Sequence, residues 1–383
     1  MSFYLEPRLS VPRWLSPVAT ILALLVALVI SGVVIAFVGG DPIRSYGHIL
    51  NAAFGSVGVI SDTLAKATPL LLTGLACTLA FRMRLWNIGA EGQLLLGAWG
   101  ASAVVLFPLL PEGTPGFVVI PAMMLAGAAA GAAWGLIPGV LRALLGVNEI
   151  ITTLMLNYVA LFWIQFWVFG PWSEGGFQQS ATFPKEAFLP RLTDFASAVP
   201  AFAGLTVHLG FLFGVGAAVI VWLVLERSRW GYEIRLVGDS PAAARYAGVD
   251  IKRLIIVVFA ASGALAGLAG MSEVSGSVHR LQDRFSPGYG YTAIIIAYLA
   301  RFDPLKVIIA SILFGALILA GREIQPSGVP AMIQGVILFC LIVADVFVRH
   351  RLRFERTTPT GAAAAGSPGG DAAGQPGTDP AKP

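Results

Sequence analysis

Charged side chains are scarce in this sequence. Asp, Glu, Lys and Arg make up 12% of the 383 residues, whereas apolar residues make up 56%. A soluble domain has about twice that charged fraction, and its core cannot bury so much apolar surface. Long uncharged runs recur along the whole chain, so lipid is expected to surround most helices. The composition therefore predicts an all-α, multi-pass membrane protein.

Cysteine is nearly absent, and so are the motifs of several enzyme classes. Cys77 and Cys340 both lie in apolar runs without paired spacing, which predicts neither a disulfide nor a metal site. The sequence has no Gly-x-x-x-x-Gly-Lys-Ser/Thr loop, so any ATP must be bound and hydrolysed by another chain. His-Glu-x-x-His and Gly-x-Ser-x-Gly are missing too. We expect a protein that is not an enzyme and has no cofactor of its own.

About ten apolar runs have the length and hydropathy of membrane spans. They lie at residues 17–38, 63–81, 92–110, 116–141, 150–170, 206–226, 254–275, 289–300, 305–321 and 330–348. The run at 289–300 is short and follows the irregular segment Ser286 to Gly290, which favours a half-helix. The first run lacks a small-residue cleavage site, which favours a span over a signal peptide.

Positive charge is distributed unevenly between the loops. Most of the 25 Lys and Arg residues fall in alternate loops that would be cytoplasmic if the N-terminus is inside. The net charge of +4 therefore reads as a topology signal and not as a nucleic-acid surface. We expect a bacterial inner-membrane protein with both termini in the cytoplasm.

The expected domain organisation follows from this topology. Residues 1–16 form a cytoplasmic N-terminal segment, and 17–350 form the transmembrane domain. Residues 351–383 form a disordered cytoplasmic tail, because from Thr357 onward the chain is mostly Ala, Gly, Pro, Ser and Thr. Within the domain, 171–205 is an external loop and 227–253 a cytoplasmic loop.

Five spans followed by five more from the opposite side would form an inverted repeat, which many transporters use to build a central site. Gly-interrupted segments precede two of the spans, at Asn87 to Gly92 and at Pro287 to Gly290. They suit discontinuous helices around a pathway, although Gly is also common in membrane helices generally. Glycines four residues apart favour close helix packing. These are Gly127, Gly131 and Gly135, and Gly263 and Gly267.

Few polar side chains lie within the spans. Thr153, Asn157 and Gln165 follow helical spacing in 150–170 and fall close to one stripe. Such side chains avoid lipid, so they either bind a polar solute or hydrogen-bond neighbouring helices. Lys66, near the outer end of its span, either reaches the interface, which we favour, or forms an ion pair or substrate contact.

Three polar residues stand at cytoplasmic helix starts. Glu91, Asn148 and Glu149 are placed where a carboxylate or an amide oxygen complements the positive end of the helix dipole. Helix capping alone would explain all three.

The cytoplasmic loop contains a compact helix signal. Ser240 is an N-cap residue, Pro241 suits the first helical position, and Gly248 is a terminator after Ala242 to Ala247. Such a helix either inserts into an ATPase groove and transmits its motion, or lies at the membrane surface.

The external loop is unusually aromatic for a linker. It carries Trp172, Phe177 and Phe183. It either docks a soluble substrate-binding protein or packs as a cap over the helix ends.

The segment Arg82 to Gln93 contains the heptad Asn-Ile-Gly-Ala-Glu-Gly-Gln at 87–93. It resembles the signature of permease subunits in nucleoside-type ABC importers, which belong with the ribose and branched-chain amino acid permeases. The stretches 67–74, 148–158 and 239–249 resemble the same family. One departure is Trp86, where Phe is usual.

This resemblance implies a nucleoside pathway and a set of partners. The partners are a cytoplasmic ATPase that binds ATP and Mg²⁺, a second homologous permease and an extracytoplasmic substrate-binding protein. Coupling to the ATPase would involve Ser240, Pro241, Ala244, Arg245, Tyr246 and Gly248. The pathway would involve Asn87, Glu91, Gln93, Thr153, Asn157, Gln165 and Tyr291.

Two other classes compete with this interpretation. An ion-coupled secondary transporter usually carries acidic residues near the membrane midplane, and here only Glu273 and Asp345 come close. A membrane scaffold or enzyme is motivated only by the missing energy-coupling motif. The sequence leaves open whether the solute is a purine or pyrimidine nucleoside, a nucleobase or a sugar, and whether the two permeases are identical.

Overall fold

The predicted spans are all present as helices in a computed structural model, which describes residues 2–8, 12, 14–321 and 328–355. Seven helices in this part of the chain are long and apolar enough to cross a membrane, and three apolar helices are shorter. The seven are α1 (Leu15–Phe37), α3 (Val57–Arg82), α5 (Gly116–Leu145), α6 (Glu149–Phe169), α7 (Leu209–Arg227), α10 (Ile251–Glu273) with the π-helical turn η4 (Val274–Val278), and α13 (Val329–Arg349). The shorter ones are α4 (Ala90–Leu106), α11 (Tyr289–Leu299) and α12 (Pro304–Ala320).

Several short elements escape prediction from hydropathy. Helix α2 (Pro42–Phe54) begins at Asp41, whose carboxylate accepts hydrogen bonds from the backbone of Ile43 and Arg44 at 3.0 and 3.2 Å. Its 13 residues are too few to span a bilayer, so the window for spans passes over it. Helices α8 (Arg229–Asp239) and α9 (Pro241–Tyr246) lie in the predicted cytoplasmic loop, and η1 (Lys185–Ala187), η2 (Leu192–Phe195) and η3 (Pro200–Phe202) lie in the external loop.

The two ends of the described chain lie side by side. Strand β1 (Ser2–Pro7) pairs antiparallel with β2 (His350–Glu355), with Ser2 opposite Glu355 and Pro7 opposite His350. An even number of spans brings the termini to the same side, and this pairing agrees with that. The predicted tail begins too early, because 351–355 belong to β2; its remainder, 356–383, lies outside the described residues.

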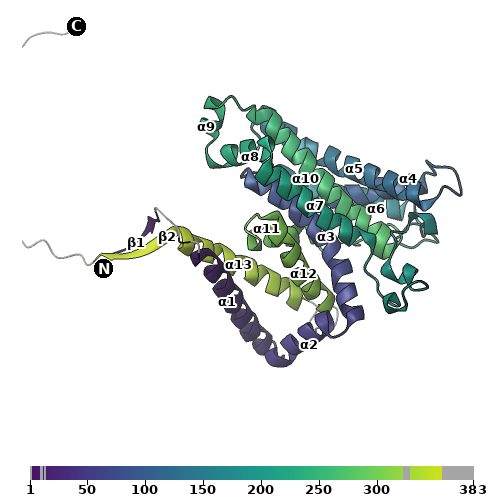
Figure 1. The fold of residues 1–383 in the computed structure, drawn as a ribbon, viewed down its shortest axis with the longest axis horizontal. Helices are drawn as coiled ribbons and strands as arrows, with labels where there is room; N and C mark the ends of the chain where they lie inside the picture. Colours follow the sequence, from purple (N-terminus) through teal and green to yellow (C-terminus); the bar gives the residue numbers. More distant parts are fainter. Residues whose placement is uncertain (1, 9–11, 13, 322–327, 356–383) are drawn as a thin grey trace, which may run out of the picture.

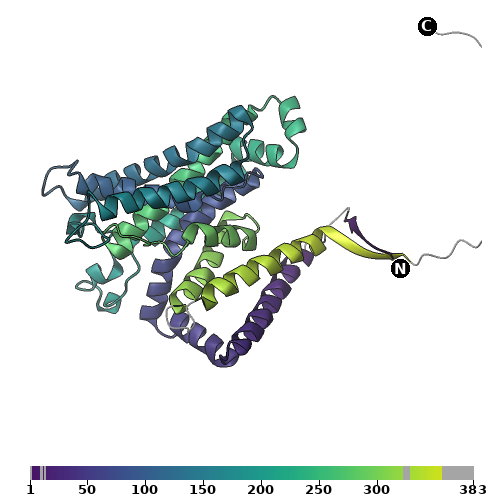
Figure 2. The same cartoon turned by 180° about the vertical axis from the view of Figure 1, so that it is seen from behind.

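Some helix contacts agree with the predicted inverted repeat, whereas α1 packs against α13 without a comparable contact between α7 and α6. The halves are α1 with α3 to α6, and α7 with α10 to α13. The second span of each half packs against the fourth span of the other, as α3 against α12 and α10 against α5. Figures 1 and 2 show α8 and α9 at the same end of the helical bundle as the strands, and the loops after α4 and α6 at the other end.

Glycines bring α4, α5 and α10 into backbone contact. A side chain at Gly131 would collide with the carbonyl oxygen of Gly263, and one at Gly97 would collide with the backbone of Gly267. The prediction that Gly127, Gly131, Gly135, Gly263 and Gly267 are packing residues is confirmed, since each faces neighbouring backbone or a neighbouring side chain at close range.

Candidate functional site

The two Gly-interrupted segments meet inside the protein. The carboxylate of Glu91, in the first turn of α4, accepts a hydrogen bond from the backbone N–H of Gly290 in α11 at 2.6 Å. Gly290 has no room for a side chain, because a Cβ there would collide with the backbone of Ala90 and Glu91. The 17 residues of α4 and 11 residues of α11 extend about 26 and 17 Å, less than the roughly 30 Å hydrocarbon core. Both helices are therefore discontinuous elements that meet at their starts.

Three successive residues of α11 are held by three different helices. The Tyr289 hydroxyl lies 3.3 Å from Glu273 Oε1 of α10, Gly290 donates to Glu91 of α4, and the Tyr291 hydroxyl accepts from Asn157 Nδ2 of α6 at 3.3 Å. Because each partner comes from a separate helix, the position of the start of α11 depends on the relative positions of α4, α6 and α10. We call this region the α4–α11 junction, comprising Asn87 to Gln93, Asn157, Ser262, Glu273 and Tyr289 to Tyr291.

Asn157 also fastens the start of α4. Its Oδ1 accepts from the backbone N–H of Gly92 at 2.9 Å, and its Nδ2 donates to the carbonyl of Ile88 at 3.0 Å. These contacts satisfy backbone groups that an irregular segment leaves open, which is how such backbone is tolerated at membrane depth. Gly92 must be glycine, since a Cβ would lie 2.8 Å from the Asn157 side chain.

Asn87 and Gln93, the first and last residues of the heptad, hydrogen-bond to each other. Asn87 Nδ2 donates to Gln93 Oε1 and to Ser262 Oγ of α10, both at 2.9 Å, while Asn87 Oδ1 accepts from the backbone of Gly89 at 3.0 Å. Ser262 in turn donates to the carbonyl of Ala76 in α3 at 2.7 Å. All three side chains are buried, so the heptad forms a network that joins α3, α4 and α10.

The seven predicted pathway residues separate into three groups. Asn87, Glu91, Gln93 and Asn157 converge in the junction, where each is buried and hydrogen-bonded within the chain. Thr153 and Gln165 make other contacts: the Thr153 hydroxyl bonds to Glu149 O at 2.7 Å in its own helix, and Gln165 Nε2 bonds to Asp283 Oδ1 at 3.2 Å. Tyr291 is the most open of the group with 42% exposure. Within the stripe of α6, Asn157 therefore matches the interhelical alternative, Gln165 bonds to a loop, and Thr153 bonds within α6.

Lys66 was expected to reach the membrane interface, but it forms an ion pair instead. Its ammonium group lies 2.7 Å from Glu273 Oε1 and 3.3 Å from the Tyr289 hydroxyl, and its side chain is only 15% exposed. Two opposite charges with little access to water attract each other strongly, and this attraction outweighs what Lys66 would gain by reaching the interface. The ion pair, the weaker alternative from the sequence, is the observed one. No sequence pattern pointed to Ser262 or to the contact of Tyr289 with Lys66.

Helix capping explains only part of the residues predicted to cap. Asn148 is the N-cap of α6 and accepts from the backbone of Ile150 at 2.9 Å, as predicted. Glu91 instead bonds to the start of α11, and Glu149 pairs with Arg142 at 3.3 Å. The partner of Glu91 is 199 residues away and that of Glu149 lies in the preceding helix, so spacing along one helix reveals neither.

Helix α9 forms where the capping signals placed it. Ser240 Oγ accepts from the backbone of Ala243 at 3.3 Å, Pro241 opens the helix, and Gly248 adopts φ +75° beyond its end. Ala244 is buried against neighbouring elements, whereas Tyr246 is 97% exposed. The helix thus presents a free aromatic side chain at the end of the bundle that carries β1 and β2 (Figure 1).

The external loop packs largely as a cap. Trp172 and Phe183 are buried, and Trp172 stacks on Trp99 of α4 with ring centres 6.1 Å apart. Arg191 donates to the carbonyl of Gly276 at 2.7 Å and lies 2.5 Å from His279 Nε2, so it ties the loop to the end of η4. Phe177, with 68% exposure, and Phe195, with 53%, remain exposed in this loop.

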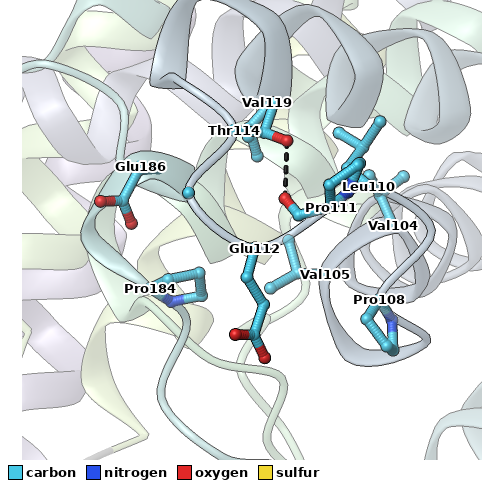
Figure 3. A pocket seen from close by; sticks show the side chains of 11 residues that line it. Val104, Val105, Pro108, Leu110, Pro111, Glu112, Thr114, Val119, Pro184 and Glu186 are labelled. Atoms are coloured by element: carbon cyan, nitrogen blue, oxygen red, sulfur yellow. Dashed lines mark hydrogen bonds between the residues drawn. The ribbon is translucent and has the colours of Figure 1, made fainter.

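A cavity of about 380 Å³ opens beside this cap. It lies between the loop after α4 and the segment Pro184 to Glu186, and Figure 3 shows the carboxylates of Glu112 and Glu186 along its edge. Thr114 donates to the carbonyl of Pro111 at 2.6 Å and fixes the turn of this loop.

Comparison with known proteins places the chain among transport permeases. Residues 59–344 match the family described as branched-chain amino acid transport system / permease component. The chain is 38% identical to the glucose ABC transporter permease protein TsgB13 of Haloferax volcanii, covering 96% of this chain and 98% of the relative. It is 33% identical to the guanosine ABC transporter permease protein NupP of Bacillus subtilis, covering 85% and 91%. It is 30% identical to the nucleoside ABC transporter permease protein NupB of Lactococcus lactis, covering 91% and 94%. Each of these organisms has a second matching permease, 26 to 29% identical to this chain.

Proposed function

This chain belongs to the family of branched-chain amino acid transport permease components and is the membrane subunit of an ABC importer, and from this premise we propose that its solute is a nucleoside. The observation that carries the proposal is the heptad at 87–93, which forms the core of the α4–α11 junction. Relatives named as guanosine and nucleoside permeases match along nearly their whole length, which supports the same solute class here.

Glucose is the second candidate. The relative named as a glucose permease has the higher identity of the three, 38% against 33% and 30%. A nucleoside and a hexose both present several ring hydroxyls, which hydroxyl and amide side chains bind through hydrogen bonds. The base is the difference, because only a nucleoside offers an aromatic face for stacking on a side chain such as Tyr291.

The proposed pathway passes along the open side of the junction. Tyr291 would contact the solute directly, while Asn157, Glu91 and Gln93 would hold Tyr291 and the two helix starts in place. A second permease would complete the cavity. The paired permeases of the relatives' organisms support a heterodimer with a homologous chain.

Coupling to ATP is proposed to run through α9. In this arrangement the partner ATPase, which binds ATP and Mg²⁺, receives the exposed side chains of Arg245 and Tyr246 in a groove. Ser240, Pro241, Ala244 and Gly248 shape the helix and set its angle to α8. A substrate-binding protein would deliver the solute at the opposite end, beside Phe177 and the cavity in Figure 3.

Uptake by the complete importer, reconstituted in vesicles with both permeases, ATPase and binding protein, tests the solute. We expect labelled guanosine or uridine to accumulate with ATP and excess glucose not to compete. Tyr291→Leu should abolish nucleoside uptake, whereas Tyr291→Phe should retain most of it because the ring remains. Accumulation of glucose with no competition by nucleosides would establish the second candidate instead.

The coupling role has a separate test. Arg245→Glu with Tyr246→Ala should leave solute binding intact but should prevent assembly with the ATPase and ATP-driven uptake. Arg229→Gln, on exposed α8, is the matched control and should assemble normally. Normal assembly and uptake by the double variant would rule out α9 as the coupling element.

A further inference from the structure

A polar cavity lies where the ends of α1, α11 and α13 meet. It has a volume of about 210 Å³, and its lining includes Thr20, Tyr298, Arg301, Asp345 and Arg349. The Arg301 guanidinium donates to Ser16 O at 3.0 Å and to Thr20 Oγ1 at 3.2 Å, whereas Arg349 pairs with Asp345 at 2.7 Å. Two cations and one carboxylate line this cavity, and Arg301 has no ion-pair partner among the contacts above, so the cavity carries a net positive charge.

A second cavity continues along the same helices and is almost wholly apolar. It measures about 410 Å³ and lies between α1, α2, α12 and α13. Leu24 and Leu28 follow Thr20 at spacings of four on α1, and Ile337 and Ile333 precede the polar cavity on the corresponding face of α13. The two cavities therefore occupy one groove that is polar at one end and apolar beyond it.

The length of the groove fits one leaflet of a bilayer. Asp345 follows Ile333 by 12 positions on α13, which corresponds to a rise of about 18 Å. One leaflet contributes about 15 Å of the roughly 30 Å hydrocarbon core. Trp14, 64% exposed at the start of α1, stands where aromatic side chains mark the membrane interface.

The dimensions argue against a helix of the second permease as the occupant. An α-helix with side chains is about 10–12 Å across, so 410 Å³ would hold only about one turn of it. A slender acyl chain fits this space along its length. The arginines at one end supply the charge complementarity that an anionic headgroup requires, as is common for basic pockets between membrane helices.

We propose that this groove binds a phospholipid with an anionic headgroup, its phosphate between Arg301 and Arg349 and an acyl chain along Leu24, Leu28, Ile333 and Ile337. The occupant bridges α1 to α12. Without it, α1 packs mainly against α13 and, to a smaller extent, against α2. Burial lowers the pKa of Arg301, Asp345 opposes this shift, and the charge of Arg349 adds to it. A phosphate between the two arginines relieves their repulsion.

Lipid titration of the delipidated full-length chain, read by native mass spectrometry, tests this proposal. Phosphatidylglycerol should bind more tightly than phosphatidylcholine with the same acyl chains. Arg349→Gln should weaken phosphatidylglycerol binding about fivefold, since each basic residue near a membrane surface contributes about 1 kcal/mol. Asp345→Asn should tighten it, because it removes the competing carboxylate. Lys306→Gln, an exposed cation outside the groove, should change nothing.

A third variant separates a lipid from free phosphate. Ala316→Phe fills the apolar cavity and should weaken phosphatidylglycerol binding without affecting inorganic phosphate. Equal binding of the two lipids, or no gain in Asp345→Asn, would overturn the proposal. Binding of inorganic phosphate with the same dependence on Arg349, unaccompanied by lipid binding, would replace it with a free-phosphate site. Cross-linking of Leu28→Cys to the second permease would assign the groove to the subunit interface.

Discussion

At the residue scale, several buried polar side chains of this protein bond to groups on distant segments of the chain. Glu91 bonds to Gly290, Glu273 to Lys66, and Asn157 to both α4 and α11. A charge or amide without a partner costs several kcal/mol in an apolar environment, so partners are essential at each site. The residues proposed to line or support the pathway therefore also hold the fold together.

The pair of Lys66 and Glu273 supplies a prediction on stability. Lys66→Met should destabilise the protein by about 3–5 kcal/mol, because Glu273 keeps a buried charge without its partner. Lys66→Met with Glu273→Leu should recover most of the loss, since neither charge is then buried. Thermal unfolding in detergent measures both. A double variant as unstable as the sum of the single ones would show that the two residues act independently.

His279 makes the outer cap sensitive to acid. Burial and the positive charge of Arg191 lower the pKa of His279 to about 4, below the ordinary value of 6.5. Arginine only donates, so His279 Nε2 must accept and the ring must be neutral in the folded protein. The unfolded state therefore binds more protons between pH 6.5 and 4, and this stabilisation is present above pH 6.5 and lost as the pH falls toward 4.

The measurement compares unfolding temperatures of the protein and of His279→Gln from pH 7 to 4. The variant should lose less stability over this range, because Gln can accept from Arg191 at every pH. His48→Gln, in exposed α2, is the control and should follow the unaltered protein. Parallel curves for the protein and His279→Gln would exclude His279 as the titrating group.

At the scale of elements, glycine spacing decides how closely the helices approach. Gly131 of α5 faces the backbone of Gly263 and Gly267 in α10, whereas Gly335 of α13 has open space where a Cβ would lie. The same residue type thus has opposite consequences on two membrane helices. The spacing of four correctly predicted close packing at Gly131. The open space beside Gly335 is visible only in the fold.

Substitution of these two glycines by alanine tests the distinction. Gly131→Ala should separate α5 from α10 and destabilise the protein by about 1–3 kcal/mol, the usual cost of overpacking. Gly335→Ala should be neutral or stabilise by up to about 1 kcal/mol, because alanine favours helix. Thermal unfolding distinguishes them, and equal effects at both sites would contradict the packing observed here.

At the scale of the whole molecule, strands β1 and β2 and helix α9 lie at one end and the aromatic cap at the other (Figures 1 and 2). The cytoplasmic location of the first end rests on the positive charges of its loops. The pairing of β1 with β2 agrees with an even number of spans. Orientation remains a prediction with a direct test.

Cysteine labelling in sealed cells measures the orientation. Both native cysteines, Cys77 and Cys340, are buried, so background labelling by a membrane-impermeant maleimide should be low. Phe177→Cys should be labelled from outside, and Tyr246→Cys only after the cells are opened, since both positions are well exposed. Labelling of Tyr246→Cys in intact cells would invert the topology and remove the coupling role of α9.

The sequence by itself determined the class of protein, the position of each apolar helix and the capped helix α9. These features depend on local composition, on periodicity and on side chains that bond to backbone within three residues, as Ser240 does to Ala243. The heptad at 87–93 was visible as well, and its three candidate residues, Asn87, Glu91 and Gln93, lie together with Asn157 in the structure.

Only the tertiary structure decided which polar residues face one another. Glu91 bonds 199 residues away to Gly290, and Lys66 pairs 207 residues away with Glu273. No local pattern encodes such a distance, because the partner is selected by how the two halves of the chain pack. The α4–α11 junction and the lipid groove both arise at this level, from helices that meet only after the whole bundle has formed.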